Sequence, residues 1–312
     1  MKRFLIVVCS FFLSYSLFAQ GESYTTVAAK DAQVKKSGSK NFENLAVGEK
    51  LTGNDVIKCN PNGNASFLHS SGKIIVYNKT KEIKLSDLSS SATSNKNLAG
   101  QLLEVTNNKL NPSNKVSSNI GGVRASENVA RDIFFITPRR GTILIDQYPV
   151  FIWNKTQGEK EFQLTILTED LDVIKTVNLT DTIYQYSEKD PKLNRGETYI
   201  CIVKPISSAK QSEYQTFTIA SEKEAEDMKA RIKETTELLS SVDDVTKHVL
   251  LGTTYEALGL YYNAFDSYKK VITLSPNEKA YRKMLADLLV KYNLIKEAQF
   301  LTGYNPADNN SK

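Results

Sequence analysis

Residues 149–153 read Pro-Val-Phe-Ile-Trp, and this alternating apolar run carries the only tryptophan of the 312-residue chain. Similar short runs of β-branched and aromatic residues lie on both sides of it, at 133–136, 142–145, 162–167, 173–177, 199–203 and 214–219. Alternation with a period of two, interrupted by turn residues, is typical of β-strands, and about seven strands at this spacing favour a two-sheet sandwich. We therefore expect a β-sandwich over residues 132–220.

Three spaced patterns suggest structural roles within this region. They are P-x-F-x-W at 149–153, L-x-x-G-x-x-Y at 193–199 and a closing F-x-I at 217–219. Together they resemble the fibronectin type III domain, which implies an immunoglobulin-like sandwich. We expect Trp153 to fill the space between the sheets and the Tyr199 hydroxyl to bond to backbone near Leu193. The alternative for Trp153 is a platform that stacks on sugars.

After residue 220 the pattern changes to helical spacing. Ser221 followed by Glu224 is a capping-box pattern, and apolar residues then recur at helical intervals to about Leu239. A second helical start comes near His248. The residues that follow it in a distinctive spacing are Leu251, Gly252, Tyr255, Gly259, Tyr261, Ala264, Tyr268 and Pro276. This spacing resembles a tetratricopeptide repeat, which implies an antiparallel pair of helices.

The small residues of this repeat have mechanical roles. Gly252 lets the two helices approach, Gly259 permits the turn, Ala264 is small at the crossing and Pro276 ends the second helix. A shift of about 34 residues, the length of this repeat, gives a weaker second copy through Leu285, Ala286, Asn293 and Ala298. We expect a helical domain of tetratricopeptide-like hairpins over 221–304 and a polar tail over 305–312.

The same resemblance implies a peptide-binding face built from the first helix of each repeat. Carried over position by position, this face consists of Thr253, Glu256, Lys283, Asp287 and Lys291. Its charged side chains alternate in sign and could hold a peptide by charge and backbone contacts. A solvated charged surface with no ligand is the equally weighted alternative.

Residues 22–88 predict a small all-β domain. Turn clusters at 37–38, 60–64 and 71–72 separate short β-rich runs at 55–58, 65–69 and 73–77. The residues that form a recognisable order are Leu45, Val47-Gly48, Leu51, Asp55-Val56-Ile57, Ala65-Ser66-Phe67, Ser71-Gly72-Lys73-Ile74 and Leu85. This order resembles the FecR-like domain, a family that occurs in envelope signalling proteins and in secreted multidomain proteins. Residues 89–131, rich in Ser, Asn and Lys, predict a linker.

The first residues predict export. Lys2 and Arg3 precede an apolar run over 4–18, and Ala19 stands before a polar shift. This is the pattern of a secretory signal peptide over residues 1–19, and the later sequence contains no run apolar enough to span a bilayer. Cys59 and Cys201 then remain in an oxidising compartment. Because they fall in different predicted domains, we favour two free thiols over a bridge.

Composition excludes several classes of protein. The chain is 40% hydrophobic and 24% charged with a net charge of +5, which disfavours wholesale disorder, a polytopic membrane protein and a nucleic-acid groove. His69 and His248 lie in different domains without ligand motifs around them. The acidic turn containing Glu169, Asp170 and Asp172 could serve acid–base chemistry or calcium, but a plain turn is the commoner outcome. We expect no catalytic residue, metal or cofactor.

The sequence therefore predicts a multidomain α+β chain with three separately cored domains. The expected function is that of an exported, non-enzymatic binding or scaffold protein of the bacterial cell envelope, periplasmic or at the cell surface, with protein or peptide partners and no nucleic acid. Two alternatives stay open. One is a sensory or regulatory component, which the FecR-like resemblance implies, and the other is a glycan-binding accessory protein that uses exposed aromatic residues.

Overall fold

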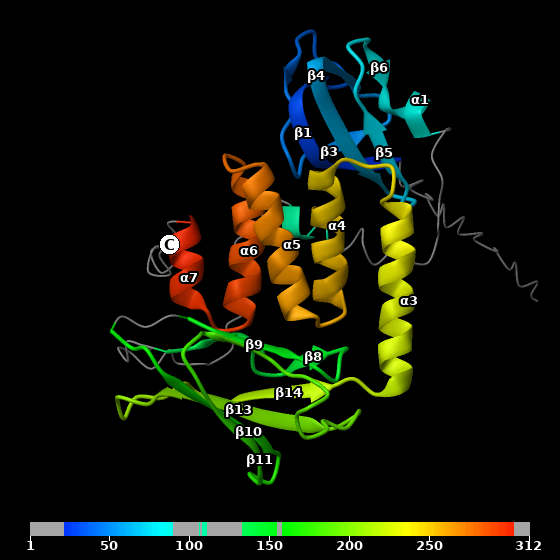
Figure 1. The fold of residues 1–312 in the computed structure, drawn as a ribbon. Coiled ribbons are helices and arrows are strands. Elements are labelled where there is room, and N and C mark those ends of the chain that lie inside the picture. Colours follow the sequence, from blue (N-terminus) through cyan, green and yellow to red (C-terminus); the bar gives the residue numbers. More distant parts are fainter. Residues whose placement is uncertain (1–21, 90–105, 107, 111–132, 155–157, 303–312) are drawn as a thin grey trace, which may run out of the picture.

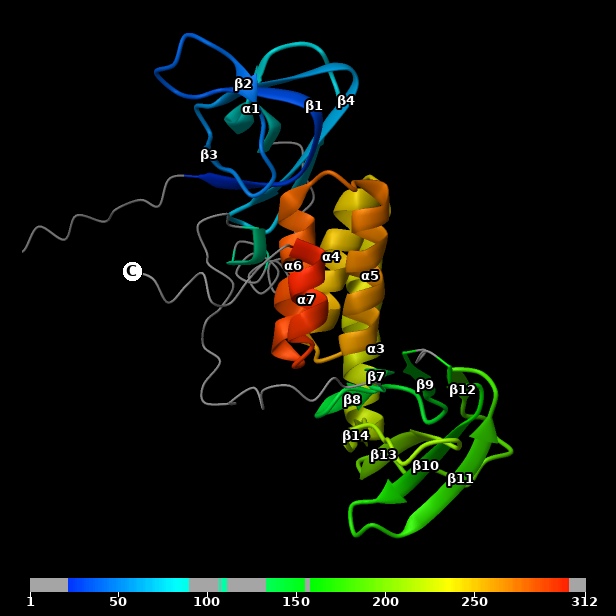
Figure 2. The ribbon, with the colours of Figure 1, turned by 90° about the vertical axis from the view of Figure 1, so that its left-hand side faces the viewer.

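The computed structural model describes residues 22–89, 106, 108–110, 133–154 and 158–302. The predicted signal peptide, most of the predicted linker and the polar tail lie outside the described residues. A block of helices occupies the middle of the molecule, with the first β-domain at one end and the second at the other (Figures 1 and 2). The fold is thus α+β, with β-rich N-terminal and central regions and helices toward the C-terminus.

The N-terminal domain is built on one long antiparallel pair of strands. Strand β1 (Ser23–Lys35) pairs with β4 (Val56–His69) over nearly its whole length, from Tyr24 opposite His69 to Lys35 opposite Val56. The remaining elements of this domain are β2 (Glu43–Asn44), β3 (Lys50–Thr52), β5 (Ile74–Tyr77), β6 (Ile83–Lys84) and helix α1 (Leu85–Ser89). Strands β2 and β3 pair with β1, and β5 and β6 pair with β4.

One expectation for this domain is wrong. The cluster at 60–64 is not a turn between two strands, because β4 runs through it without a break. Lys30 pairs with Asn64 and Ala32 with Cys59, so residues 60–63 face Asp31 alone in a large bulge. Residues that favour turns also tolerate the positive φ that a bulge needs, and Asn62 has φ 65°.

The second β-domain is a sandwich of two sheets. Its strands are β7 (Phe135–Thr137), β8 (Thr142–Leu144), β9 (Val150–Trp153), β10 (Phe162–Thr168), β11 (Val173–Leu179), β12 (Ile183–Gln185), β13 (Thr198–Pro205) and β14 (Gln215–Ile219). One sheet has the order β11-β10-β13-β14-β8 and the other the order β12-β9-β7. The sequence indicated seven of these eight strands and missed β12.

Aromatic side chains fill the space between the two sheets. Trp153 is 1% exposed and meets Phe135 and Phe162 edge-on, with ring centroids 6.2 and 5.8 Å away. The Asn194 amide donates to the Tyr199 hydroxyl at 2.6 Å, next to the buried Leu193. This is the corner bond that the sequence predicted, and it closes the connection into β13.

Within the described residues, five helices follow the sandwich. They are α3 (Glu222–Leu238), α4 (Asp244–Ala257), α5 (Tyr261–Leu274), α6 (Lys279–Lys291) and α7 (Ile295–Thr302). The predicted capping box is present at the start of α3, where Ser221 and Glu224 satisfy each other's backbone amides. Helices α4 and α5 form one hairpin and α6 and α7 a second. No helix within the described residues has the length and apolar character that crossing a membrane requires.

The small residues of the first hairpin are in tight places. A Cβ on Gly252 would lie 2.4 Å from the ring of Tyr268, so only glycine lets α4 and α5 approach this closely. Gly259 has φ +74° in the turn, Ala264 is fully buried, and Pro276 comes just after α5 ends. In the second hairpin Leu285, Ala286 and Ala298 are buried, and Asn293 has φ 60° in the turn.

The described residues form three buried clusters, as expected, but the helical cluster is not separate from the N-terminal domain. Val27, Val47 and Leu68 of the N-terminal domain belong to the same buried cluster as the inner faces of α4, α5 and α6. The Tyr281 hydroxyl on α6 donates to the Val27 carbonyl at 3.0 Å, and Ser66 donates to the Asp243 carboxylate at 2.8 Å. The helical hairpins are too few to bury their own faces, so the N-terminal domain covers one end of them.

Candidate functional site

The candidate site lies on the side of the helical block formed by α4 and α6. We call it the α4–α6 face and define it by the five predicted residues Thr253, Glu256, Lys283, Asp287 and Lys291. Thr253 and Glu256 lie on α4, and the other three lie on α6. The two helices pack within one buried cluster, which holds the two parts of the face in place.

Thr253 does not face a ligand. It is fully buried, and its hydroxyl donates to the Val249 carbonyl one turn earlier at 2.8 Å. A second contact of the Thr253 side chain is with the fully buried Tyr268 of α5. Thr253 therefore lies inside the first hairpin.

Glu256 is the centre of the face. Its side chain is only 6% exposed and accepts a hydrogen bond from the Tyr268 hydroxyl at 3.1 Å. Lys109 reaches it from outside helices α3–α7, with Nζ 2.9 Å from Oε1, and Lys291 lies farther away at 3.8 Å. Burial and then the nearby Glu256 charge raise the pKa of Tyr268, so this phenol stays a donor.

Lys283 and Asp287 pair with each other. The Lys283 ammonium lies 2.9 Å from Asp287 Oδ2, one helical turn away, and both side chains are largely covered. The other carboxylate oxygen of Asp287 is buried and has no hydrogen-bond partner. The structure thus joins Glu256 with Lys291 and Lys283 with Asp287, while Thr253 is linked to Glu256 only through Tyr268.

The most important neighbour of this face was not found from the sequence. Lys109 and Leu110 fall inside the region predicted as a linker, yet Leu110 is 1% exposed and belongs to the cluster shared by the N-terminal domain and the helices. The coloured segment around 108–110 lies beside the helices and below the N-terminal domain (Figures 1 and 2). An apolar residue within a polar stretch was the one available signal.

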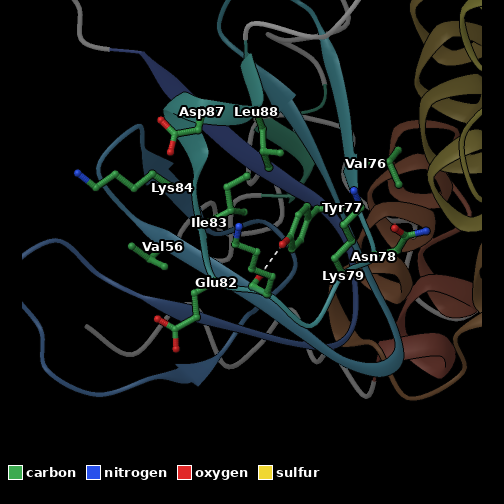
Figure 3. Close-up of a pocket in the computed structure, with 11 residues that line it drawn as sticks. Val56, Val76, Tyr77, Asn78, Lys79, Glu82, Ile83, Lys84, Asp87 and Leu88 are labelled. Carbon is green, nitrogen blue, oxygen red and sulfur yellow. Dashed lines mark hydrogen bonds between the residues drawn. The ribbon is translucent and has the colours of Figure 1, made fainter.

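Two other concavities lie elsewhere on the described surface. A hollow of about 820 Å³ lies on the N-terminal domain. Its lining residues are drawn in Figure 3, where Tyr77 donates a hydrogen bond to the Lys81 carbonyl. The charged ends of Glu82, Lys84 and Asp87 spread around its rim and do not meet at one point (Figure 3). A shallower groove of 510 Å³ is lined mainly by apolar side chains of α5, α6 and α7.

The remaining candidates of the sequence are not part of this face. His69 is in β4, where its Nδ1 contacts the Ser71 hydroxyl at 2.7 Å, and His248 is in α4. Glu169 and Asp170 are exposed in the turn between β10 and β11. Within the described part of the chain, no three His, Cys, Asp or Glu side chains are placed to hold a metal ion.

Cys59 and Cys201 are free and buried in different domains. Burial raises the pKa of both thiols, so neither is activated as a thiolate.

Comparisons with known proteins add little to this geometry. No family model matches the chain, and no curated protein matches it. Among solved structures, the chain is similar to a biofilm-associated protein BSP domain at 11% identity and a TM-score of 0.21, over 65% of this chain and 25% of that one. It is also similar to the FN1–FN3 domains of chicken CNTN1 at 13% identity and a TM-score of 0.21, over 65% of this chain and 58% of that one. The chain thus spans less than two thirds of either structure, and likeness at this TM-score carries no functional argument.

Proposed function

We propose that this chain is an exported, non-enzymatic binding or scaffold protein of the bacterial cell envelope. In this proposal the helical block separates the two β-domains. The β-domains and the helical hairpins all offer surfaces to protein partners. The finer family resemblances belong to the same proposal. The N-terminal domain is FecR-like, the sandwich is fibronectin type III-like, and the two helical hairpins are tetratricopeptide-like.

The observation that carries the proposal is the attachment of a β-domain at each end of the helical block. At the N-terminal domain the attachment is the shared apolar cluster described above. At the sandwich it is Arg139, which is 3% exposed and donates to the Phe135 carbonyl at 2.8 Å and to the Tyr292 carbonyl at 2.6 Å. Arg195 adds an ion pair with Glu222 of α3 at 2.8 Å. Two surfaces attached in this way can hold two partners at a set separation.

The first experiment tests export. The protein is recovered from the native host by fractionation, and the mass of its N-terminal peptide is measured. The proposal expects a mature chain that begins at Gln20, outside the cytoplasm. A full-length chain that begins at Met1 and stays with the cytoplasmic fraction would contradict export.

The second experiment tests binding. Intact cells of the native host are treated with a lysine-reactive cross-linker, and cross-linked peptides of this chain are identified by mass spectrometry. The proposal expects repeated cross-links from the β-domains to the same few envelope proteins, which an exported control protein of similar abundance does not share. If the chain were found cross-linked only within itself, the scaffold function would be wrong.

A further inference from the structure

The pairing of Glu256 with Lys109 is a contact between distant parts of the chain. The two side chains are 6% and 14% exposed, so water covers little of either charge. A carboxylate with so little contact with water needs a charged or hydrogen-bonding partner. Lys291, which is 53% exposed, contributes only a contact of 3.8 Å. Lys109 is therefore the main charged partner of Glu256, although it belongs to no part of the helical domain.

The next residue, Leu110, is held by the N-terminal domain as well as by the helices. A Cβ added to Gly48 would lie only 1.9 Å from the Leu110 carbonyl oxygen, and Gly48 has φ +82°. The Gly48 amide donates to the Thr26 carbonyl at 2.8 Å. This hydrogen bond ties the turn to β1, so the turn cannot easily shift away from Leu110. Any larger residue at position 48 would exclude the segment.

These two contacts define a seat with two parts. In the first part, Glu256 of α4 binds a cation. In the second part, the turn at Gly48 and the apolar cluster around Val47 and Leu68 bind the leucine that follows this cation in sequence. Residues on both sides of the domain boundary build this seat, so it exists only while the N-terminal domain stays on the helices. A lysine followed directly by a leucine satisfies both parts.

We propose that this seat is a recognition site for segments of partner proteins that carry lysine followed by leucine, and that Lys109 and Leu110 occupy it in cis as an internal ligand. This inference rests on the proposed binding function and names the chemistry of the partner. A tethered segment has an effective concentration in the millimolar range. A partner segment with the same chemistry must therefore compete with it, and binding is strong only where the internal segment has been released.

The test uses the full chain and a fluorescent synthetic peptide that spans residues 104–112. The released variant carries Lys109→Glu and Leu110→Asp, and its fold is checked by circular dichroism. We expect the peptide to bind the released variant at least about tenfold more tightly than the wild-type chain. Adding Glu256→Gln to the released variant, or replacing the lysine of the peptide with glutamate, should weaken binding by a similar factor.

Failure to bind the folded released variant would overturn the proposal, and so would equal binding of the two peptides. If the released variant does not fold, the wild-type chain is titrated with millimolar peptide. Amide hydrogen exchange at Lys109 and Leu110 must then rise with peptide concentration, and a constant rate contradicts the proposal. These outcomes are distinct from those of the cross-linking experiment. If cross-links to envelope proteins were found but the peptide did not bind, the proposed recognition site would be wrong and the scaffold function would stand.

Discussion

Asp190 shows how single residues stabilise the sandwich. It accepts hydrogen bonds from Lys175 at 2.6 Å and Tyr184 at 2.7 Å, and from the Ser187 amide at 2.8 Å. Burial alone raises the pKa of this carboxyl, but these donors outweigh it and lower the pKa from 3.8 to about 2. Asp190 is therefore a charged acceptor that ties β11 and β12 to the loop before β13.

This low pKa predicts an acid-sensitive contribution to stability. Because the folded pKa lies below the unfolded value of 3.8, the stabilisation is complete above that pH and is lost as the pH falls toward 2. Tryptophan fluorescence during urea unfolding reports on the sandwich, since Trp153 lies in its core. We expect Asp190→Asn to lower the free energy of unfolding at neutral pH and to remove this part of the pH dependence. The exposed Asp181→Asn is the control, and an unchanged acid profile in Asp190→Asn would contradict the assignment.

Trp153 gives a second prediction at the residue scale. Replacing this buried ring with alanine leaves a cavity in the core, and such substitutions cost about 3–5 kcal/mol of unfolding free energy. We expect Trp153→Ala to lose about this much in urea unfolding followed by circular dichroism. Tyr214→Ala, at a site that is 54% exposed, should change stability by less than about 0.5 kcal/mol. Identical unfolding of Trp153→Ala and wild type would show that the ring is not in the core.

At the scale of elements, the first helical hairpin depends on Gly252. An alanine here would gain up to about 1 kcal/mol of helix propensity. Its Cβ would press on the ring of Tyr268, which is fully buried and held through its hydroxyl by Glu256. We expect a net loss of about 1–2 kcal/mol, because overpacking usually outweighs propensity.

The matched control for Gly252→Ala is the same substitution in a Tyr268→Leu chain. With the ring removed, Gly252→Ala should be neutral or stabilising in thermal unfolding. If Gly252→Ala destabilised both chains equally, the contact with Tyr268 would not be the reason for the glycine.

Elements were predictable where local chemistry decides them. Ser221 with Glu224, Gly259 and Tyr199 each act through neighbours close in sequence, so their roles could be inferred from spacing. The bulge at 60–63 could not be inferred, because whether such residues turn the chain or bulge within a strand depends on the partner strand β1. Strand pairing between distant residues decided that case.

At the scale of the whole molecule, the helical core extends into the N-terminal domain, which also has a core of its own. Sequence patterns mark the buried face of each element but not which element covers it, so the contacts of Val27, Leu68 and Leu110 with the helical cluster could not be predicted. The same reason hid the pairing of Lys109 with Glu256. The peptide-binding role of the five predicted residues stays a prediction, and the ion pair that covers Glu256 was missed.

The shared core predicts coupled stability. Leu68 is 1% exposed and belongs to the cluster with the helices, whereas Leu51 is 2% exposed in the separate core of the N-terminal domain. Each alanine substitution should cost about 2–5 kcal/mol. In hydrogen exchange, Leu68→Ala should speed exchange in α4 and α6 as well as in the N-terminal domain, and Leu51→Ala should act mainly in that domain. Faster exchange confined to the N-terminal domain in both variants would contradict a shared core.

The most direct test of the scaffold is the distance between its two β-domains. Spin labels are placed at Lys40→Cys and Glu169→Cys, which are exposed in the N-terminal domain and the sandwich, and the chain without these substitutions controls for the buried Cys59 and Cys201. Double electron–electron resonance on the full chain then gives the distribution of label distances. The account predicts one narrow peak, since both domains are fixed to the helical block. A broad distribution would mean that the domains move independently, and the chain would then not hold its surfaces at a set separation.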